Sequence, residues 1–186
     1  GFRWFDHAMF FDKRHMDHWF LAFAFVATHN HFVLDRGGKV FNRSAPVIKL
    51  PEGASEDEYL DLLGVLNSST ACFWLKQVCH DKGNGGYGGG IADQEWERFF
   101  EFTGTKLGEF PLPVVFPRER ARGLDALAQR ASDLMPSVVL AGAGEDLAGE
   151  LSGARESWVS CREQMIFEQE ELDWETYRLY GLVGED

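Results

Sequence analysis

The sequence predicts an α+β fold, in which a small mixed or antiparallel β-sheet with a buried helix precedes a C-terminal helical hairpin. Three observations predict it: β-forming residues flank a turn signal in residues 22–50, apolar helical spacing covers residues 60–79, and helical spacing returns in residues 118–182. The chain has 186 residues, 45% of them apolar, so it can bury a sizeable core. We expect an α+β domain over residues 1–117 and a helical appendage packed on it over residues 118–186.

The predicted sheet begins with a hairpin. Residues 22–34, AFAFVATHNHFVL, are rich in β-formers and lead into the turn sequence DRGG at residues 35–38. Residues 39–50, KVFNRSAPVIKL, then predict the returning strand. Because proline cannot donate a ladder hydrogen bond, Pro46 places this strand at a sheet edge or at a bulge. Further along, residues 100–113, FEFTGTKLGEFPLP, predict a strand that ends in a Pro-x-Pro exit.

A buried helix is predicted over residues 60–79. Ser55 and Glu58 precede it with the spacing of a capping box, and the acidic residues there favour the helix dipole. The polar sequence Asn-Ser-Ser at residues 67–69 interrupts the helix once. Apolar residues on more than one face indicate that it is largely buried. These residues are Leu62, Leu63, Val65, Leu66, Cys72, Phe73 and Leu75.

The C-terminal region predicts a helical hairpin. Residues 118–135 carry apolar side chains at helical spacing, and Pro136 and the Gly-Ala-Gly sequence at residues 142–144 break the pattern. A second helix follows from about residue 145, with a seam of under three heptads that is short for an independent coiled coil. An antiparallel hairpin is therefore expected, closed by a short helix in residues 171–182 with a glycine stop. The seam residues are Leu147, Leu151, Ala154, Trp158, Cys161 and Met165.

Charge and composition exclude several classes of function. A net charge of −12 argues against indiscriminate nucleic-acid binding through bulk electrostatics. However, residues 1–50 hold seven Lys/Arg against four Asp/Glu and five of the six histidines, so any polyanion is expected to bind there. Three cysteines are too few for a disulfide framework and favour a reducing cytoplasm. No run of about eighteen apolar residues exists, so no membrane partner is expected.

No catalytic residue, cofactor site or metal site is predicted in the chain itself. There is no G-x-S-x-G motif, and no cysteine has the local signature of a nucleophile. A literal G-x-G-x-x-G at residues 83–88 follows a helix and leads toward a strand, whereas a dinucleotide site needs the reverse order. A connecting or DNA-facing loop is the better interpretation. The histidines and Cys79 lack the converging spacing of a zinc site.

The predicted hairpin is the best candidate for binding nucleic acid. It presents Asn, His, Arg and Lys, the residue types that contact phosphates and base edges. An ordinary exposed hairpin explains the same residues, and both interpretations stay open at this point. The candidate DNA-binding residues, including several outside the hairpin, are Lys13, Arg14, His29, Asn30, His31, Arg36, Lys39, Asn42, Arg43, Lys76, Lys82 and Asn84.

Several short sequence motifs occur in this chain in a defined order. LLGVLNSS is followed by FWLK within residues 62–76, then by FPLP at residues 110–113 and by a C-terminal LD…YRLYGL at residues 172–182. This combination resembles the target-recognition side of adenine-N6 DNA methyltransferases of the TaqI-like and type IIG lineage. WFDHAMFFDKRH, THNHFVLDRGGKVFNRSAPVIKLP and TGTKLGEFPLP more closely resemble PglX-type methyltransferases of type 2 BREX (phage growth limitation) systems. The likeness spans nearly the whole chain and implies a C-terminal region of such an enzyme.

The resemblance implies a parent enzyme that methylates adenine in specific DNA sites with S-adenosylmethionine, in bacterial phage defence. It also implies a catalytic half with a glycine-containing cofactor loop and an Asn-Pro-Pro-Tyr/Phe motif. This chain has neither motif and no adjacent prolines, so we expect it to be inactive alone and to bind no S-adenosylmethionine. The expected partners are double-stranded DNA, the catalytic domain of the parent chain and other BREX proteins in the cytoplasm.

Two further interpretations stay open. Residues 118–186, with seven basic against fifteen acidic residues, could instead be an interaction module that docks the catalytic domain or another BREX subunit. A self-sufficient metal-dependent nuclease is the weakest alternative, because the sequence shows no metal-ligand spacing.

Overall fold

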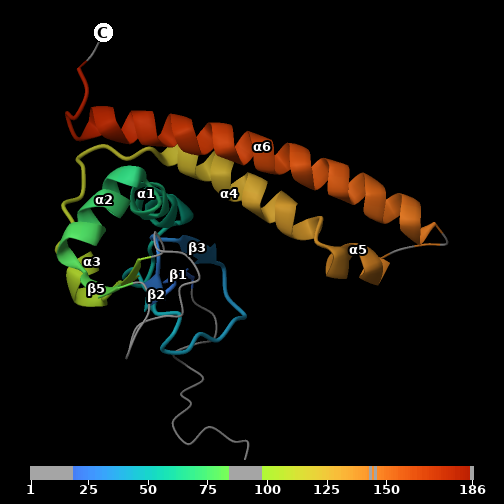
Figure 1. Cartoon of the computed structure of the whole chain (residues 1–186), viewed down its shortest axis with the longest axis horizontal. Coiled ribbons are helices and arrows are strands. Elements are labelled where there is room, and N and C mark those ends of the chain that lie inside the picture. Colours follow the sequence, from blue (N-terminus) through green and yellow to red (C-terminus); the bar gives the residue numbers. More distant parts are fainter. Residues whose placement is uncertain (1–18, 84–97, 143, 145, 185–186) are drawn as a thin grey trace, which may run out of the picture. The chain divides into compact units, whose positions relative to one another are not determined.

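The chain forms two compact units, each made from two separate stretches of sequence. The computed structural model describes residues 19–83, residues 98–142, residue 144 and residues 146–184. Unit 1 comprises Gly1–Ser55 and Trp74–Phe110, and unit 2 comprises Glu56–Phe73 and Pro111–Asp186. Small antiparallel sheets and a long C-terminal helical region confirm the predicted α+β class (Figure 1). The units interleave along the sequence, and the predicted domain division at residues 117/118 stays a prediction.

The first sheet of unit 1 has the strand order β3-β1-β4, all antiparallel, with β1 (Phe20–Phe23), β3 (Phe32–Asp35) and β4 (Val47–Ile48). All four residues of β1 are buried, as the sequence of a central strand requires, and Leu21 pairs with both Leu34 and Ile48. The predicted hairpin is therefore wrong in its pairing. Residues 22–34 fold back on themselves, and the returning β4 pairs with β1 instead of β3. Its edge position next to Pro46 agrees with the proline rule.

The second sheet of unit 1 has the order β2-β6-β5, with β2 (Val26–Ala27), β6 (Phe99–Glu101) and β5 (His80–Gly83). β6 is antiparallel to both neighbours, and a register shift lies between Asp81 and Gly83. Because β2 follows β1 after two residues, the polypeptide passes directly from one sheet into the other. This second sheet carries the candidate site described below.

The predicted strand over residues 100–113 is too long. After β6 the chain turns into the short helix α3 (Gly104–Leu107), where the Thr103 hydroxyl accepts a hydrogen bond from the Lys106 amide at 3.3 Å. A threonine in this position satisfies a free amide of the first helical turn, so it favours helix over strand. Phe110 is buried, and its ring lies edge-to-face with Trp74, with the ring centroids 5.4 Å apart.

The helix predicted over residues 60–79 is two helices, α1 (Glu56–Leu66) and α2 (Ser69–Val78). α1 starts directly after Ser55, as the capping box predicts. At the break, the buried Ser68 hydroxyl donates to the Val65 carbonyl at 2.6 Å and accepts from the Ala71 amide at 3.2 Å. One side chain thus ends α1 and begins α2. Phe73, predicted to be buried, is 70% exposed, so the prediction is wrong at this position.

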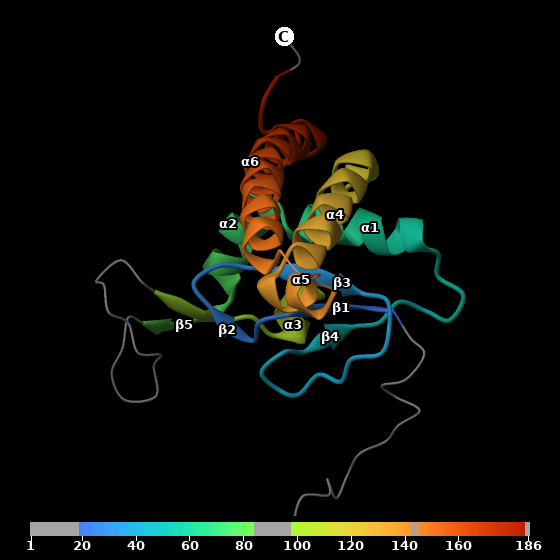
Figure 2. The same cartoon turned by 90° about the vertical axis from the view of Figure 1, so that its right-hand side faces the viewer.

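The helical hairpin of unit 2 is confirmed. α4 (Arg118–Asp133) leads through the short α5 (Pro136–Gly142) into α6 (Leu147–Leu179), and α4 and α6 lie side by side in both views (Figures 1 and 2). Pro136 begins α5, and the absence of its amide hydrogen does not destabilise the helix, because an amide at the first helical position has no intrahelical acceptor. The predicted short terminal helix is the last part of α6, which stops at Gly181 with φ +65°. In the described part of the chain, no helix has the length and apolarity to cross a membrane.

A polar contact set, which we call the α2–α6 joint, fastens the end of α6 to the break between α1 and α2. Asp173 Oδ1 accepts from the Ser69 amide at 2.7 Å, so a carboxylate from α6 caps α2. The Ser69 and Tyr177 hydroxyls are hydrogen-bonded at 2.7 Å. Gln169 Nε2 donates to the Asn67 carbonyl at 3.2 Å. Residues about one hundred positions apart therefore form one structural element within unit 2.

Candidate nucleic-acid interface

Cationic and imidazole side chains gather around the β2-β6-β5 sheet of unit 1. We call these six residues the basic cluster, which has two groups: His29, His31 and Lys76 lie near one another with Lys76 over Phe100, and Arg43, His80 and Lys82 lie around Glu101. Two of its members lie over aromatic rings. Lys76 Nζ is 5.6 Å from the centroid of the Phe100 ring, and Arg43 Cζ is 5.9 Å from that of Phe25. Cations held over rings keep their remaining hydrogen-bond donors available for another ligand.

Strand register explains how one side of the cluster forms. His80 pairs directly with Glu101 across β5 and β6, and Lys82 is the residue at the register shift between Asp81 and Gly83, where its side chain reaches the same Glu101. Lys82 Nζ is 2.6 Å from Glu101 Oε2. The hydrogen bond from Lys82 is the main reason that the pKa of Glu101 is lowered, and His80 and Arg43 add to the effect. Glu101 is thus the carboxylate that lets these cations approach one another.

The other side of the cluster comes from the loops around β2. The His29 and His31 rings lie edge-to-face with centroids 4.3 Å apart, and the Thr28 hydroxyl is 2.8 Å from His29 Nδ1. Partial burial lowers the pKa of His29 below its ordinary 6.5, and His31 and Lys76 lower it further. The loop that carries Arg43 is held by the Phe25 amide, which donates to the Ser44 carbonyl at 3.1 Å. Burial and the neighbouring positive charges thus both disfavour the protonated form of the His29 imidazole.

The other sequence-predicted residues lie elsewhere or are engaged. Arg36 Cζ is 5.8 Å from the centroid of the Trp19 ring, and Lys39 Nζ is 3.5 Å from Asp35 Oδ2, both beside the β3 turn. Gly37 and Gly38, both with positive φ, confirm this turn. Asn30 is buried, and Asn42 Oδ1 accepts from the Ser44 amide at 2.9 Å. Lys13, Arg14 and Asn84 lie outside the described residues.

The structure therefore brings together five of the twelve predicted residues: His29, His31, Arg43, Lys76 and Lys82. His80 was missed as a DNA-binding candidate, because it lies outside the predicted hairpin and no strand was predicted at residues 80–83. A predicted strand there would have placed His80 and Lys82 on one strand beside β6. Among the residues that the structure describes, no three His, Cys, Asp or Glu side chains come close enough to hold a metal ion. The three cysteines are free, as expected without a disulfide framework: Cys79 and Cys161 are buried and Cys72 is half-buried.

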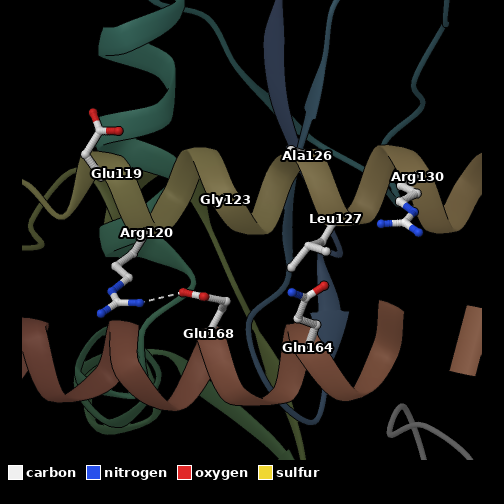
Figure 3. A pocket seen from close by; sticks show the side chains of 8 residues that line it. All are labelled: Glu119, Arg120, Gly123, Ala126, Leu127, Arg130, Gln164 and Glu168. Carbon is white, nitrogen blue, oxygen red and sulfur yellow. Dashed lines mark hydrogen bonds and ion pairs between the residues drawn. The ribbon is translucent and has the colours of Figure 1, made fainter. Parts of the chain in front are cut away.

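Unit 2 has an open groove of about 680 Å³ between α4 and α6 (Figure 3). Gly123 and Ala126 leave room on α4, and Leu127 points toward Gln164 of α6. At one end, Arg120 donates to Glu168 at 2.7 Å and to Glu171 at 3.3 Å, and the hydrogen bond to Glu168 raises its pKa. These interactions tie the two helices together. The groove has no catalytic grouping of side chains and is best understood as the wide part of the helix seam.

Comparison with known proteins gives one informative match. Over 171 residues the chain is 55% identical to the adenine-specific methyltransferase PglX of Streptomyces coelicolor. The aligned region covers 90% of this chain but 14% of the relative, so the chain spans about one-seventh of that protein's length. No family model matches the chain, and no solved structure matches it.

Proposed function

We propose that this chain is a non-catalytic DNA-recognition segment, from the C-terminal side, of a PglX-type adenine-N6 DNA methyltransferase that acts in a bacterial BREX phage-defence system. The identity with PglX supports the parent class, and the lack of a methyl-donor loop or Asn-Pro-Pro-Tyr motif in the sequence supports a non-catalytic role. S-adenosylmethionine then belongs to the parent's catalytic half. The segment would work in the bacterial cytoplasm, where the parent meets double-stranded DNA.

The basic cluster is the observation that carries the DNA-binding part of the proposal. His29, His31, Arg43 and His80 are exposed, and their side chains come from separate places in the sequence. The described residues of unit 1 contain eight Lys/Arg against five Asp/Glu, while those of unit 2 contain seven against sixteen. A locally positive surface on an acidic chain is what a selective contact with a polyanion requires, because non-selective binding follows overall charge. We assign the cluster to phosphate contacts, which position a protein on DNA.

The test is the salt dependence of DNA binding by the longer methyltransferase. Each lost phosphate contact lowers the slope of log Kobs against log salt by about 0.9. Arg43→Gln combined with Lys76→Gln should therefore reduce the slope by about 2 and weaken binding at low salt. Both side chains lie over aromatic rings at the surface, so their replacement should leave the fold intact.

Lys49→Gln is the matched control. It removes one exposed positive charge from the same unit, but Lys49 Nζ lies 5.3 Å from the Phe20 ring centroid in the first sheet, apart from the basic cluster. The control should leave the slope unchanged. If the double variant and Lys49→Gln behave alike, the assignment of the basic cluster to DNA is wrong.

A further inference from the structure

The long helix α6 has two apolar faces, and the structure covers one of them. The covered face packs within unit 2 and includes the buried Cys161 and Leu172, with Cys161 Sγ 3.1 Å from the Leu127 carbonyl. The second face, which we call the outer stripe, consists of Val159, Ile166, Phe167 and Trp174. At 100° per residue, the stripe is centred opposite Cys161 and Leu172, and Tyr177 of the α2–α6 joint lies in line with Val159 at its C-terminal end. A surface helix normally has one apolar face, so the second indicates a partner.

The outer stripe is exposed, and its Trp174 ring packs against a neighbouring ring. Its four side chains are 43%, 58%, 58% and 45% exposed in sequence order, and they extend over about 22 Å of helix. Trp174 lies edge-to-face with Tyr177, ring centroids 5.5 Å apart, and Tyr177 belongs to the α2–α6 joint. A tryptophan held in place in this way is the kind of anchor that dominates protein interfaces, because little entropy is lost on docking.

Glutamates run along the middle of this face. Glu156, Glu163 and Glu170 are exposed and recur every seven residues, and by helical spacing the last two lie between the stripe's apolar side chains. None of the three forms an ion pair with another described residue. By contrast, Glu168 and Glu171 on the covered side bind Arg120. A partner that covers the stripe must therefore bury Glu163 and Glu170 and pair them with cations, since unpaired buried charge is costly.

The negative charges of these glutamates exclude three other partners for the outer stripe: a nucleic acid, an anionic membrane and a second copy of α6. A nucleic acid or an anionic membrane would place negative charge against the glutamates. A second copy of α6 on the same face would put one carboxylate row against another. Arg155 and Arg162 are exposed at one margin of the face and Arg178 at the other, where solvent screens them, so the central glutamates decide the partner's charge.

We propose that the outer stripe of α6 is a docking surface for a protein element with apolar side chains on both sides of a Lys/Arg row. This element lies elsewhere in the longer methyltransferase polypeptide. The choice of source rests on the proposed function, under which about six-sevenths of the polypeptide lies outside this chain. An element on the same polypeptide has a high effective concentration, so a modest interface is enough to keep it docked.

Cysteine reactivity in the longer methyltransferase tests the proposal. Ile166→Cys lies in the stripe, and Gln129→Cys on α4 is the control at an exposed position outside it. Rates of thiol modification are resolved by mass spectrometry and divided by the rates in denaturant. Ile166→Cys should react about tenfold or more slowly than Gln129→Cys, as expected for an interface held closed by effective concentrations in the millimolar range. Equal normalised rates would overturn the docking surface.

Charge reversal tests the chemistry of the partner. Glu163→Lys with Glu170→Lys should raise the rate of Ile166→Cys to that of Gln129→Cys and leave the control rate unchanged. Protection that survives the reversal would overturn the basic partner.

DNA affinity, measured on the same proteins, separates the docking surface from the DNA-recognition proposal. If Arg43→Gln with Lys76→Gln leaves DNA binding intact while Ile166→Cys stays protected, the DNA-recognition proposal fails and the docking surface stands. If the double variant lowers the salt slope as expected while Ile166→Cys reacts as fast as Gln129→Cys, the docking surface fails and the DNA-recognition proposal stands.

Discussion

Gly64 is the residue of α1 on which the packing of α4 most directly depends. A Cβ atom at this position would lie 2.8 Å from the Ala121 Cβ, 3.3 Å from the Pro117 Cγ and 3.5 Å from the Pro117 carbonyl oxygen. Ala121 and Pro117 are both buried, and neither has a flexible side-chain end that could move aside. Gly64→Ala therefore forces α1 and the start of α4 apart by several tenths of an ångström.

The expected free-energy change has two parts. Overpacking of a well-packed contact costs about 1–3 kcal/mol. Replacing glycine by alanine inside a helix raises the free energy of unfolding by about 0.8–1.0 kcal/mol, because alanine has the higher helix propensity. Gly123→Ala in α4 is a matched control, because nothing lies within 4 Å of the Cβ that it adds. It should therefore show only the stabilisation that comes from the higher helix propensity of alanine. The difference between the two variants, about 1–3 kcal/mol, isolates the steric cost.

Urea unfolding followed by far-ultraviolet circular dichroism measures this difference, since most helical signal comes from unit 2. We expect the midpoint to fall for Gly64→Ala and to rise for Gly123→Ala, with unchanged slopes that justify comparing the two. If both variants are stabilised equally, the close approach of α1 to Ala121 is wrong, and with it the packing described for this part of unit 2.

Three further predictions concern the α2–α6 joint and the basic cluster. Asp173→Ala should destabilise the chain by about 0.5–2 kcal/mol in the same urea assay, because it removes the cap of α2, whereas Glu170→Ala should have little effect. Tyr177→Phe should cost about 0.5–1.5 kcal/mol for the lost hydroxyl contact with Ser69, and an unchanged midpoint would contradict that contact. The pKa of His29 lies below 6.5, so His29 is neutral at pH 7.5 and must take up a proton to bind a phosphate as a cation. DNA affinity of the longer protein should therefore rise as the pH is lowered below 6.5, and His29→Gln should flatten this pH dependence.

Local chemistry made most of the helices predictable. Ser55 marked the start of α1, the heptad seam marked the covered face of α6, and Gly181 marked its end. The sequence could not show that α6 runs unbroken through residues 171–179, because acidic residues there break the apolar seam without breaking the helix. Two of them, Glu171 and Glu175, pair with Arg120 on α4, a contact that spans about fifty residues, and Asp173 accepts from the Ser69 amide. Tertiary ion pairs of this kind are absent from any local pattern.

The sheets were less predictable, because strand pairing is decided by non-local contacts. Residues 22–34 had the composition of one strand, but they contain part of β1, all of β2 and most of β3. The candidate site was hard to predict for the same reason. The predicted hairpin groups His29 and His31 with Arg36 in its turn and Lys39 on its return strand, whereas the structure places Arg36 against the Trp19 ring and Lys39 against Asp35. It brings the two histidines to Lys76 instead, and this proximity depends on the packing of α2 in unit 1.

The two sequence motifs on which the methyltransferase resemblance most depends are parts of one contact. The Asn-Ser-Ser sequence at residues 67–69 supplies the break between α1 and α2, and the C-terminal motif supplies Asp173 and Tyr177, which bind it at Ser69. Their chemistry is that of a helix cap and a hydroxyl pair, with no group placed to bind a ligand. The motifs therefore identify a way of joining helices, and variants of the joint should change stability while leaving the salt dependence of DNA binding unchanged. Variants of Arg43 and Lys76 should change the salt dependence of DNA binding and leave stability unchanged. The two measurements together therefore distinguish the residues that stabilise unit 2 from those proposed to contact DNA.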